Sequence, residues 1–343
     1  MGIIKSIKFK KNSFEYIKPF SISVGTSVST HNIEVILETE EGYTGFGEAS
    51  PSFRVTGERV ESLLSLEKAI NDALKGENTR KYKRIFAKTD KFFSHPSLKT
   101  SIQYAVLDAL CEELGIHVCE FLGGMKDIIE TDKTIGIASI EERITEAEKA
   151  YKEGFRILKI KIGKNLHEDL EVMEEIYKRT KGATYILDAN TSYTPKLAIL
   201  YTQKLFQKGI DIALLEQPVP IHDKEGLRLV RFNSPYPIGA DESAKNKYDV
   251  LDLIKNEAVD YINIKLMKCG ISDALNIVEI AQASHIGLML GCMGESSLGI
   301  NQSIHFALGT GAFTFHDLDS AFMLKEDKFR GKYKVKIPYY GVN

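Results

Sequence analysis

Residues 157–190 contain one complete strand–helix–strand unit, with the sequence ILKIKIGKNLHEDLEVMEEIYKRTKGATYILDAN. An apolar run ends at Lys161, a helical segment follows, and a second apolar run ends at Asp188. Short apolar runs that alternate with helical segments are typical of parallel sheets, because a crossover helix must return the chain to the same edge. The unit therefore predicts a parallel β/α architecture in this part of the chain.

The same alternation continues on both sides of this unit, from Thr134 onward. The interval from the first to the last apolar run corresponds to about 26 residues per unit. Eight strands on one period predict a (β/α)₈-type barrel, whereas a doubly wound open sheet rarely keeps so even a period. No GxGxxG motif follows the first strand, which also disfavours the open sheet. The predicted strands end near Ile137, Lys161, Asp188, Glu216, Asp241, Lys265, Gly291 and Asp317.

The part of the chain before Thr134 has a different pattern, in which strands precede helices. Two runs with strand character are separated by Glu40-Glu41-Gly42, which predicts a hairpin turn. Further along, apolar residues recur at helical spacings of three and four, and Gly115 predicts the end of the last helix. We expect an α+β unit here. Its predicted strands are residues 3–9, 33–39 and 44–49, and its predicted helices are residues 60–74 and 101–114.

Charge and composition exclude several classes of protein. The 45 Lys and Arg against 47 Asp and Glu give a net charge of −2, so no basic excess favours nucleic acid or anionic lipid. No apolar run approaches the ~18 residues that a membrane span needs, and residues 1–11 lack the apolar core of a signal peptide. The four cysteines form no CxxC pair, which favours a reducing compartment. We therefore expect a cytoplasmic protein without a nucleic acid or membrane partner.

Charged residues follow the apolar runs where the barrel strands are expected to end, and active sites of such barrels form at those ends. A single charge there is usually a solvated loop residue, but here six strands share the feature. Asp188, Glu216 and Asp241 end three successive strands, so their carboxylates can converge on one side of the barrel mouth. Three hard oxygen ligands without cysteine or histidine suit Mg²⁺. The sequence therefore predicts a Mg²⁺ site on these three residues.

Three lysines occupy the strand ends around this predicted metal site. Lys159 and Lys161 are two residues apart on one strand, so both point into the barrel. Lys265 ends a strand four positions further around the barrel, so Lys161 and Lys265 are expected to face each other across the cavity. Removal of a proton α to a carboxylate requires a metal to stabilise the charge on the oxygens, and Lys159 adds a second cation there. One lysine that removes the proton and an opposite one that returns it would invert the carbon.

Asp317 and Asp319 form a second acidic feature, at the end of the last strand. They are two residues apart and share a face, on the strand opposite the centre of the predicted metal site. Two adjacent carboxylates favour a cation, most simply an ammonium group. The substrate would then carry a carboxylate at one end and an ammonium at the other, separated by about the width of the barrel lumen. A dipeptide fits this description, with the chemistry at the α-carbon of its second residue.

Together these residues resemble the enolase superfamily, in particular its muconate-lactonizing subgroup and, within that, the dipeptide epimerases. Asp317-x-Asp319 is the most specific sign of that branch, and segments 264–268 and 291–296 are also similar to it. The resemblance covers nearly the whole chain and implies an α/β protein with a modified TIM barrel, (β/α)₇β. The implied domains are an α+β capping domain over residues 1–125, the catalytic barrel over residues 126–320, and a C-terminal segment, residues 321–343, that returns to the cap.

The resemblance also implies a role for each site residue. The chain is expected to be an isomerase that inverts the second residue of a dipeptide, with Mg²⁺ as cofactor. It is also expected to form a homo-oligomer. The implied residues are Lys161 and Lys265 as the acid/base pair, Asp188, Glu216 and Asp241 as metal ligands, and Lys159, Thr134, Met293, Asp317 and Asp319 as substrate contacts.

The cap of this family closes over the barrel with two loops, which the resemblance places at about residues 19–30 and 49–58. Arg54 is the only cation between Ala49 and Glu58, and a guanidinium suits the carboxylate of a Glu side chain. A solvated loop arginine is the alternative interpretation. We hypothesise that L-Ala-D/L-Glu from peptidoglycan turnover is a substrate, with related Ala-Xaa dipeptides as alternatives.

The sequence is also compatible with two other functions. A muconate cycloisomerase or an o-succinylbenzoate synthase of the same subgroup would share the lysines and the metal, but its substrate lacks an ammonium. Asp317 and Asp319 would repel a second carboxylate, which disfavours this alternative. A non-catalytic barrel that only binds a ligand is the alternative of another class, although such a protein does not need opposed lysines beside a metal site.

Overall fold

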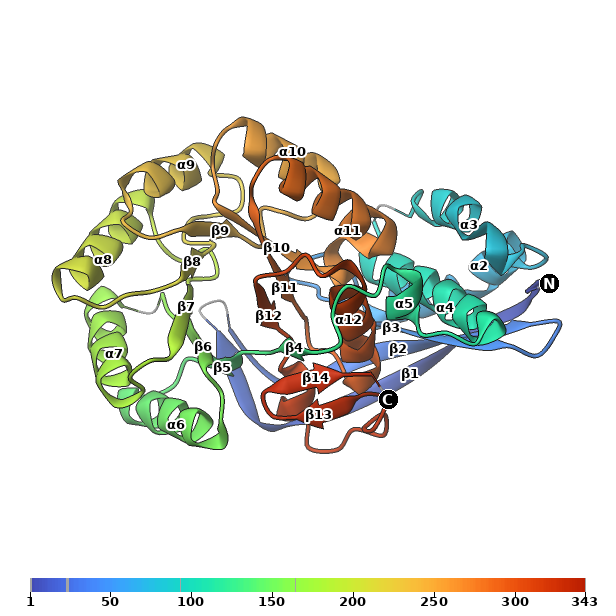
Figure 1. Cartoon of the computed structure of the whole chain (residues 1–343), viewed down its shortest axis with the longest axis horizontal. Coiled ribbons are helices and arrows are strands. Elements are labelled where there is room, and N and C mark those ends of the chain that lie inside the picture. The colour runs from blue at the N-terminus through green and yellow to red at the C-terminus, as the bar shows by residue number, and fades with distance from the viewer. Residues whose placement is uncertain (1, 23–24, 93, 164, 343) are drawn as a thin grey trace.

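The structure, a computed structural model, describes residues 2–22, 25–92, 94–163 and 165–342. Within these residues the strands form three sheets, ordered β1-β2-β3, β5 through β12, and β4-β14-β13. Figure 1 shows the eight-stranded sheet inside a ring of helices, with the three N-terminal strands on one flank. In the described part of the chain, no helix is long and apolar enough to cross a membrane.

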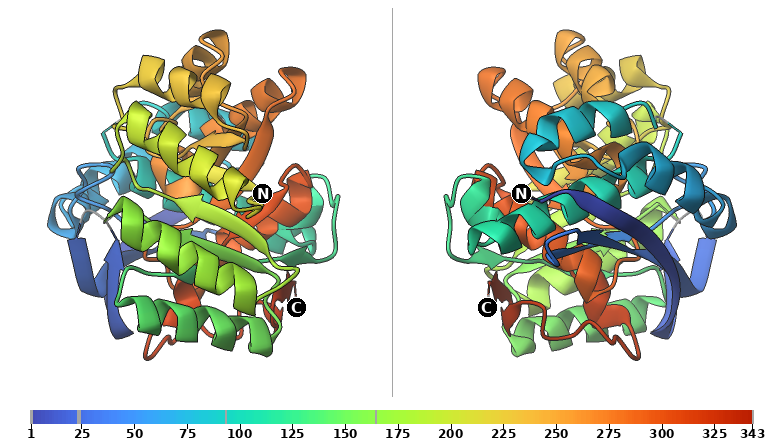
Figure 2. Two further views of the ribbon diagram at one scale, coloured as in Figure 1. Left: turned by 90° about the vertical axis from the view of Figure 1, so that its left-hand side faces the viewer. Right: turned by 90° about the vertical axis from the view of Figure 1, so that its right-hand side faces the viewer.

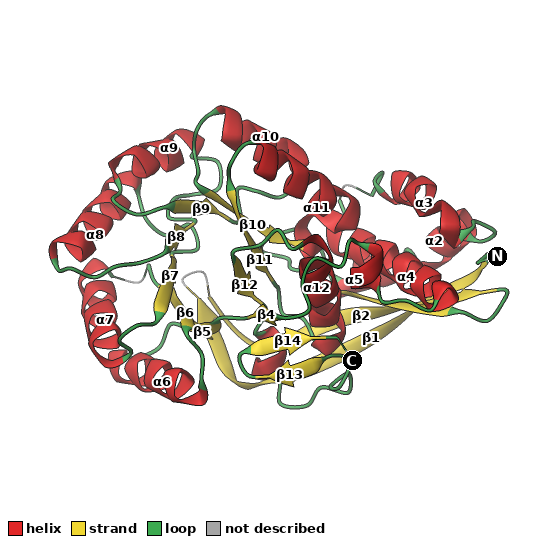
Figure 3. Cartoon of the chain, in the orientation of Figure 1, coloured by secondary structure: helices red, strands yellow, loops and turns green. Residues whose placement is uncertain are grey.

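The central sheet is a parallel barrel with one helix between each pair of successive strands (Figure 3). The predicted (β/α)₇β architecture is therefore confirmed, and the strands end within two residues of the predicted positions. The strands are β5 (Lys133–Ile135), β6 (Ile157–Lys161), β7 (Thr184–Asp188), β8 (Leu214–Glu216), β9 (Ile238–Ala240), β10 (Tyr261–Lys265), β11 (Gly287–Gly291) and β12 (Phe315–Asp317). The helices are α6 (Ile140–Glu153), α7 (Leu166–Arg179), α8 (Pro195–Gln207), α9 (Lys224–Asn233), α10 (Lys247–Lys255), α11 (Leu266–Ala283) and α12 (Ser297–Thr310).

The first and last barrel strands meet through the segment that precedes β5. The backbone N–H of Asp132 donates to the carbonyl of His316 at 2.9 Å. The N–H of Leu318 donates to the hydroxyl of Thr131 at 3.0 Å. These bonds bring the side chains that precede β5 next to those that follow β12.

An apolar layer fills the lumen directly below the charged strand ends. Ile186, Leu214 and Met289 form a buried cluster, against which Ile157, Tyr261 and Phe315 pack. Four of these residues lie two positions before the last residue of their strand, and Ile157 and Tyr261 lie four positions before it. The period of two along a strand therefore places all six under the charged layer. The charged layer therefore rests on an apolar floor that excludes water from below.

The N-terminal part is the predicted α+β unit, with an antiparallel sheet covered by helices (Figure 2). The predicted hairpin turn joins β2 and β3, and Gly115 ends α4 in the left-handed conformation with φ of 69°. The elements are β1 (Ile4–Ile22), β2 (Gly25–Thr39), β3 (Thr44–Ala49), α1 (Val60–Leu64), α2 (Glu67–Leu74), η1 (Thr79–Lys81), α3 (Tyr82–Thr89), α4 (Pro96–Leu114) and α5 (Val118–Phe121).

Two N-terminal predictions differ from the structure. The single helix predicted over residues 60–74 is two helices, broken where the Ser65 hydroxyl donates to the carbonyl of Ser62, a local bond that competes with the helix. The loop expected at residues 19–30 is, in its described part, the end of the β1–β2 hairpin. Apolar alternation stops early in β1, and pairing with β2 extends the strand to Ile22. Residues 23–24 lie outside the described residues.

The end of the chain contacts both the N-terminal unit and the barrel. After η2 (Ser320–Met323), Leu324 and Phe329 pack with Phe14 and Leu298. The N–H of Lys325 donates to the carbonyl of Glu15 at 2.9 Å. The strand β13 (Lys334–Lys336) then pairs with β14 (Tyr339–Gly341), and β14 pairs with β4 (Ile129–Glu130), which leads into the barrel.

We predict that Gly47→Ala destabilises the N-terminal unit. A Cβ at Gly47 would lie 2.0 Å from the backbone carbonyl oxygen of Ser101, so β3 and α4 would have to separate. The expected loss in the free energy of unfolding is about 3 kcal/mol. Urea unfolding measures it, with Thr44→Ala on the same strand as the control. An unchanged unfolding midpoint for Gly47→Ala would show that the strand–helix contact is not tight.

Candidate active site

Strand alternation places the predicted site residues in one charged layer above the apolar floor. Lys161 lies beside Asp188 in the register of β6 and β7, and Asp188 lies beside Glu216 in the register of β7 and β8. Asp241 directly follows β9, which continues the row. The three carboxylates predicted to bind metal thus form a row on successive strands, and all three are buried.

The two lysines predicted as the acid/base pair lie at opposite ends of this row. Lys161 Nζ lies 2.5 Å from Asp188 Oδ2, and Lys265 Nζ lies 2.8 Å from Asp241 Oδ2. Burial lowers the pKa of Lys265, but the Asp241 carboxylate more than offsets this effect and holds the pKa above its usual value. Gly291, next to Lys265 on β11, leaves room for this side chain, since a Cβ there would lie 2.9 Å from Lys265 Cε.

Lys159 lies at the centre of the layer and is completely buried. Its ammonium is 2.8 Å from Glu216 Oε2, 3.2 Å from Asp188 Oδ2 and 2.6 Å from Asp317 Oδ2. Burial lowers the pKa of Lys159, but the surrounding carboxylates, Asp317 foremost, raise it well above its usual value. The expectation that Asp317 lies a lumen's width from the metal row is therefore corrected, because one ammonium bridges them.

The carboxylates respond differently to burial. Burial raises the pKa of Asp188, but Lys161 and then Lys159 outweigh it and lower this pKa to about 2. For Glu216, burial and the nearby Asp188 charge prevail, and its pKa is raised. Asp241 has two lysine partners, Lys265 and Lys268, which hold its pKa below the usual range despite burial. The row therefore requires positive charge to stay ionised.

Two residues to which the sequence assigned no role, Lys268 and Asn263, support the row. Lys268 Nζ contacts Asp241 Oδ1 at 2.6 Å and also donates to the Asn263 carbonyl at 3.0 Å. The Asn263 side-chain amide donates to Glu216 Oε1 at 2.6 Å. Their positions carried a signal, because Lys268 is one helical turn after Lys265, and Asn263 is two residues before Lys265 on the same strand face.

The donor set of the row fits a hard divalent cation. The three carboxylates supply oxygen ligands, and each is paired with at least one lysine ammonium in this structure. Positive charge is thus what these buried oxygens require, and Mg²⁺ accepts such ligands while keeping other positions for water and substrate. The tightest acidic group among the described residues is a different one, however: Asp132, Asp317 and Asp319.

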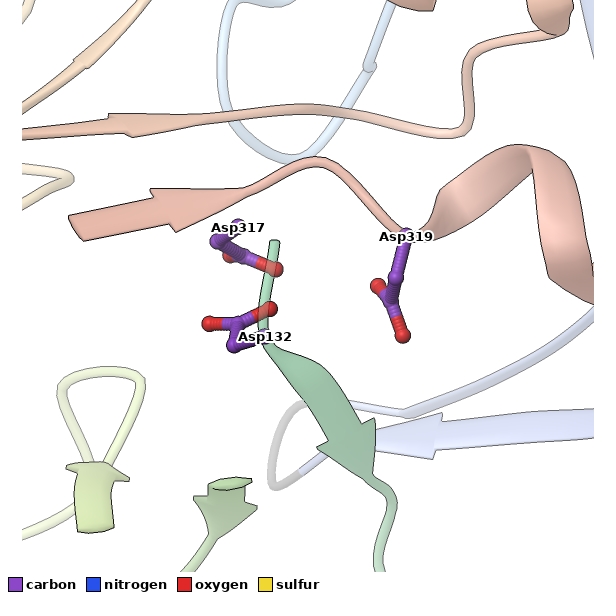
Figure 4. Close-up of side chains that lie close together, drawn as sticks. All are labelled: Asp132, Asp317 and Asp319. Carbon is purple, nitrogen blue, oxygen red and sulfur yellow. The ribbon is translucent and has the colours of Figure 1, made fainter. Parts of the chain in front are cut away.

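Figure 4 shows the side chains of the second acidic group, two of which, Asp317 and Asp319, bind Thr134. The Thr134 N–H donates to Asp319 Oδ2 at 2.9 Å, and its hydroxyl donates to Asp319 Oδ1 and Asp317 Oδ1 at 3.2 and 3.3 Å. Lys133 Nζ also contacts Asp319 Oδ2, at 2.8 Å. One carboxylate oxygen each of Asp132, Asp317 and Asp319 lies within 4.8 Å of the others. Thr134 therefore orients Asp317 and Asp319, the pair predicted to bind an ammonium. Asp132 is a third carboxylate in the same acidic group.

Side chains of the N-terminal sheet hold the loop that carries Met293. The carbonyl of Gly294 accepts hydrogen bonds from Thr30 Oγ1 at 2.9 Å, Asn32 Nδ2 at 3.0 Å and Ser50 Oγ at 3.1 Å. Close by, the buried Glu48 accepts from the Ser296 N–H at 2.8 Å. The N-terminal unit thus fixes the position of a barrel loop next to the charged layer.

The two segments expected to cover the barrel contact each other at Arg54. A Cβ at Gly25 would lie 2.6 Å from Arg54 Nη2, so the guanidinium lies directly on the backbone of the hairpin end. The same hairpin reaches the barrel, since the Ile137 N–H donates to the carbonyl of Ser21 at 2.9 Å. Arg54 itself is exposed. The structure therefore places Arg54 at the junction of both segments.

Comparison with known proteins gives consistent results across the chain. Residues 6–123 match the family "Mandelate racemase / muconate lactonizing enzyme, N-terminal domain", and residues 142–343 match "Enolase C-terminal domain-like". The L-Ala-D/L-Glu epimerase of Thermotoga maritima is 59% identical over 333 residues, which are 97% of this chain and 96% of that protein.

Two solved structures share the fold closely. A substrate-liganded complex of the L-Ala-D/L-Glu epimerase from Bacillus subtilis has a TM-score of 0.96 and 33% identity, covering 100% of this chain and 97% of that one. The dipeptide epimerase from Enterococcus faecalis V583, complexed with Mg and the dipeptide L-Leu-L-Tyr, has a TM-score of 0.95 and 33% identity, covering 99% and 97%.

We predict that Glu48→Gln changes stability in a pH-dependent way. Burial raises the pKa of Glu48 to about 8. The stabilisation that follows from this raised pKa is fully present below the ordinary pKa of a Glu side chain, and it is lost as the pH rises through about 8. The free energy of unfolding of Glu48→Gln relative to wild type should therefore increase between about pH 5 and about pH 9. Urea unfolding at both pH values, with the exposed Glu40→Gln as control, checks this. A pH-independent difference would contradict it.

Proposed function

The chain belongs to the mandelate racemase/muconate lactonizing enzyme family of the enolase superfamily, and from this premise we propose that it is a Mg²⁺-dependent dipeptide epimerase. The observation that carries the proposal is the charged layer of the barrel. It has a lysine at each end of a carboxylate row, and Lys159 connects that row to the acidic pair beside Thr134. A dipeptide has a matching group for each of these features: a carboxylate for the metal row, an acidic α-proton for the two lysines, and an ammonium for the acidic pair.

The best substrate candidate is L-Ala-D/L-Glu, as in peptidoglycan turnover. The relative at 59% identity is an L-Ala-D/L-Glu epimerase. Arg54 supports this choice, because an exposed guanidinium at the junction of the covering segments can pair with the side chain of a second-residue Glu. Met293, on the loop held by the N-terminal sheet, would contact the substrate from the side of that sheet.

The two lysines at the ends of the row would carry out the proton transfers. Lys161, as the neutral amine, takes the α-proton on one face, and the electron pair of the broken C–H bond moves into the substrate carboxylate. Lys265, as the ammonium, then gives a proton to the opposite face while the electron pair returns to the α-carbon, which inverts the carbon. In the opposite direction Lys265 is the neutral base and Lys161 the ammonium acid. Each lysine contacts a carboxylate of the row, which orients its side chain.

Asp188, Glu216 and Asp241 would hold Mg²⁺, which stabilises the negative charge on the substrate carboxylate when bound. Lys159, which is buried among these carboxylates, would add its own positive charge there. Lys268 and Asn263 would keep two members of the row oriented. Thr134 would orient Asp317 and Asp319 toward the substrate ammonium.

We further propose the domain division that the resemblance implies. Residues 1–125 and 321–343 would form the cap, and residues 126–320 the catalytic barrel. The hydrogen bonds from three cap residues to Gly294 support such a division of labour, since they join cap and barrel beside the site. The protein would act in the cytoplasm as a homo-oligomer. Free cysteines at all four positions are compatible with a reducing compartment.

We predict that the enzyme exchanges the Glu α-proton of L-Ala-L-Glu with solvent and forms the L,D diastereomer. Proton NMR in D₂O with Mg²⁺ measures both processes. Lys161→Ala and Lys265→Ala should each abolish the formation of the diastereomer, because each removes the group on one face of the carbon. Addition of a chelator should stop the wild-type reaction.

The same spectra contain the contrary outcomes. Full epimerisation by either lysine variant would refute the two-lysine mechanism but not the activity. If the enzyme exchanged the α-proton of none of the dipeptides in a wider L-Ala-Xaa panel, the epimerase function would be refuted. A cycloisomerase of the same subgroup would then be favoured.

We predict that Arg54→Ala raises the KM for L-Ala-L-Glu by about 10- to 100-fold, the effect of losing one charge-assisted contact. The KM for a dipeptide with an apolar second residue should stay nearly unchanged. Arg59→Ala is a matched control, because Arg59 is a neighbouring arginine that packs on Phe53 instead. An unaltered preference for acidic second residues in Arg54→Ala would remove Arg54 from the specificity site.

A further inference from the structure

Asp132 lies inside the barrel but has no part in the function described so far. It precedes β5 by one residue and is completely buried. Asp132 and Thr134 are two residues apart, as are Lys159 and Lys161, so the same alternation directs both of their side chains into the lumen. Figure 4 shows the Asp132 carboxylate facing that of Asp317, with Asp319 reaching in from the turn after β12.

The carboxylate of Asp132 lacks the partners that a buried carboxylate needs. Neither Oδ1 nor Oδ2 has a hydrogen-bond partner among the described residues. An unsatisfied buried carboxylate is costly, and such a group in a native protein calls for a functional explanation. Because one of its oxygens lies within 4.8 Å of oxygens of Asp317 and Asp319, the missing partner would be a group shared by all three.

The charge balance of the acidic group indicates what that partner is. Asp319 is paired with Lys133 at 2.8 Å, and Asp317 is paired with Lys159 at 2.6 Å. Lys159 also contacts Asp188 and Glu216, so its charge compensates the Asp317–Asp319 pair only in part. Asp132 adds a third carboxylate, and the negative charge of the group then favours a cation such as an ammonium ion.

The geometry favours an ammonium over a metal ion. An ammonium group has three N–H donors, and the three carboxylates supply three acceptors around one point. Lys133 and Lys159 direct their own ammonium groups at two of the three carboxylates, so a divalent cation placed there would meet two close positive charges. A monovalent ammonium meets half of that repulsion.

We propose that Asp132 is a substrate-binding residue that, with Asp317 and Asp319, forms a three-carboxylate site for the N-terminal ammonium of the dipeptide. The proposal rests on the proposed dipeptide epimerase function and assigns it a further specificity residue. Asp132 adds negative charge to the site, which favours a free N-terminus over an acylated or deaminated one.

The pKa of Asp132 couples its ionisation to the binding of the ammonium. Burial, followed by the charges of Asp317 and Asp319, raises the pKa of Asp132 well above its usual value, although Lys159 acts in the other direction. Glu216 also raises it from across the lumen. An arriving ammonium opposes these effects and favours the ionised carboxylate.

The test compares two ligands that differ only in the ammonium group: L-Ala-L-Glu and propanoyl-L-Glu, which has a hydrogen in its place. If the wild type exchanges another L-Ala-Xaa dipeptide faster, that dipeptide and its propanoyl analogue are used. The variant is Asp132→Asn, which keeps the shape and can still donate a hydrogen bond to Asp317. The exposed Asp127→Asn is the matched control.

We expect Asp132→Asn to raise the KM for the dipeptide by about 10- to 100-fold. We expect kcat and the competitive inhibition constant of propanoyl-L-Glu to change by less than about threefold. Because one sample gives the constants of both ligands, their ratio does not depend on the fraction of folded protein.

An unchanged ratio in an active Asp132→Asn variant would overturn the proposal. It would assign Asp132 the role of a neutral acid that only donates to Asp317, a role that Asn can fill. Equal weakening of both ligands would also overturn it, because the effect would then not depend on the ammonium. If the wild type itself exchanges no dipeptide, the proposed function fails, and this outcome is distinct from both others.

Discussion

The buried ammonium of Lys159 is the interaction on which the rest of the site depends. It contacts Glu216, Asp188 and Asp317 at once, and so joins carboxylates from three different strands in one network. Without this charge, several carboxylates would face one another in a lumen closed from below by apolar side chains. The desolvation that makes the network costly also makes each charge effective, because electrostatic interactions are stronger where water is excluded.

The two parts of the molecule meet at this same layer. The barrel supplies the charges, and the N-terminal unit supplies the hydrogen bonds that hold the Gly294 carbonyl and the start of α12. Within that unit, Gly45 and Gly47 let β3 approach the backbone of α4 closely, since neither has a side chain to separate the strand from the helix. The reacting groups lie on the barrel strands, and the segments that would recognise the substrate side chain lie on the covering unit. This separation lets the substrate range vary without a change in the reacting groups.

The parts of the site that follow from strand periodicity could be predicted. Each of the lysines at 159, 161 and 265 follows an apolar run, and alternation alone directs it into the barrel. Asp132 was missed, although it obeys the same two-residue spacing from Thr134, because only barrel closure between β5 and β12 brings it to Asp317. Lys268 was missed because it lies on a helix, and its contact with Asp241 depends on how α11 begins.

By itself, the sequence determined the parallel barrel, its strand ends and the charged residues that line its mouth, because local periodicity and strand direction are encoded in consecutive residues. Only the tertiary structure decided which charge pairs with which. Asp317 was expected a lumen's width from the metal row, yet it shares the Lys159 ammonium with Glu216. Which charges pair depends on the distances between side chains across the lumen. These distances are set by the closure of the barrel and by the need of each buried charge for a compensating partner.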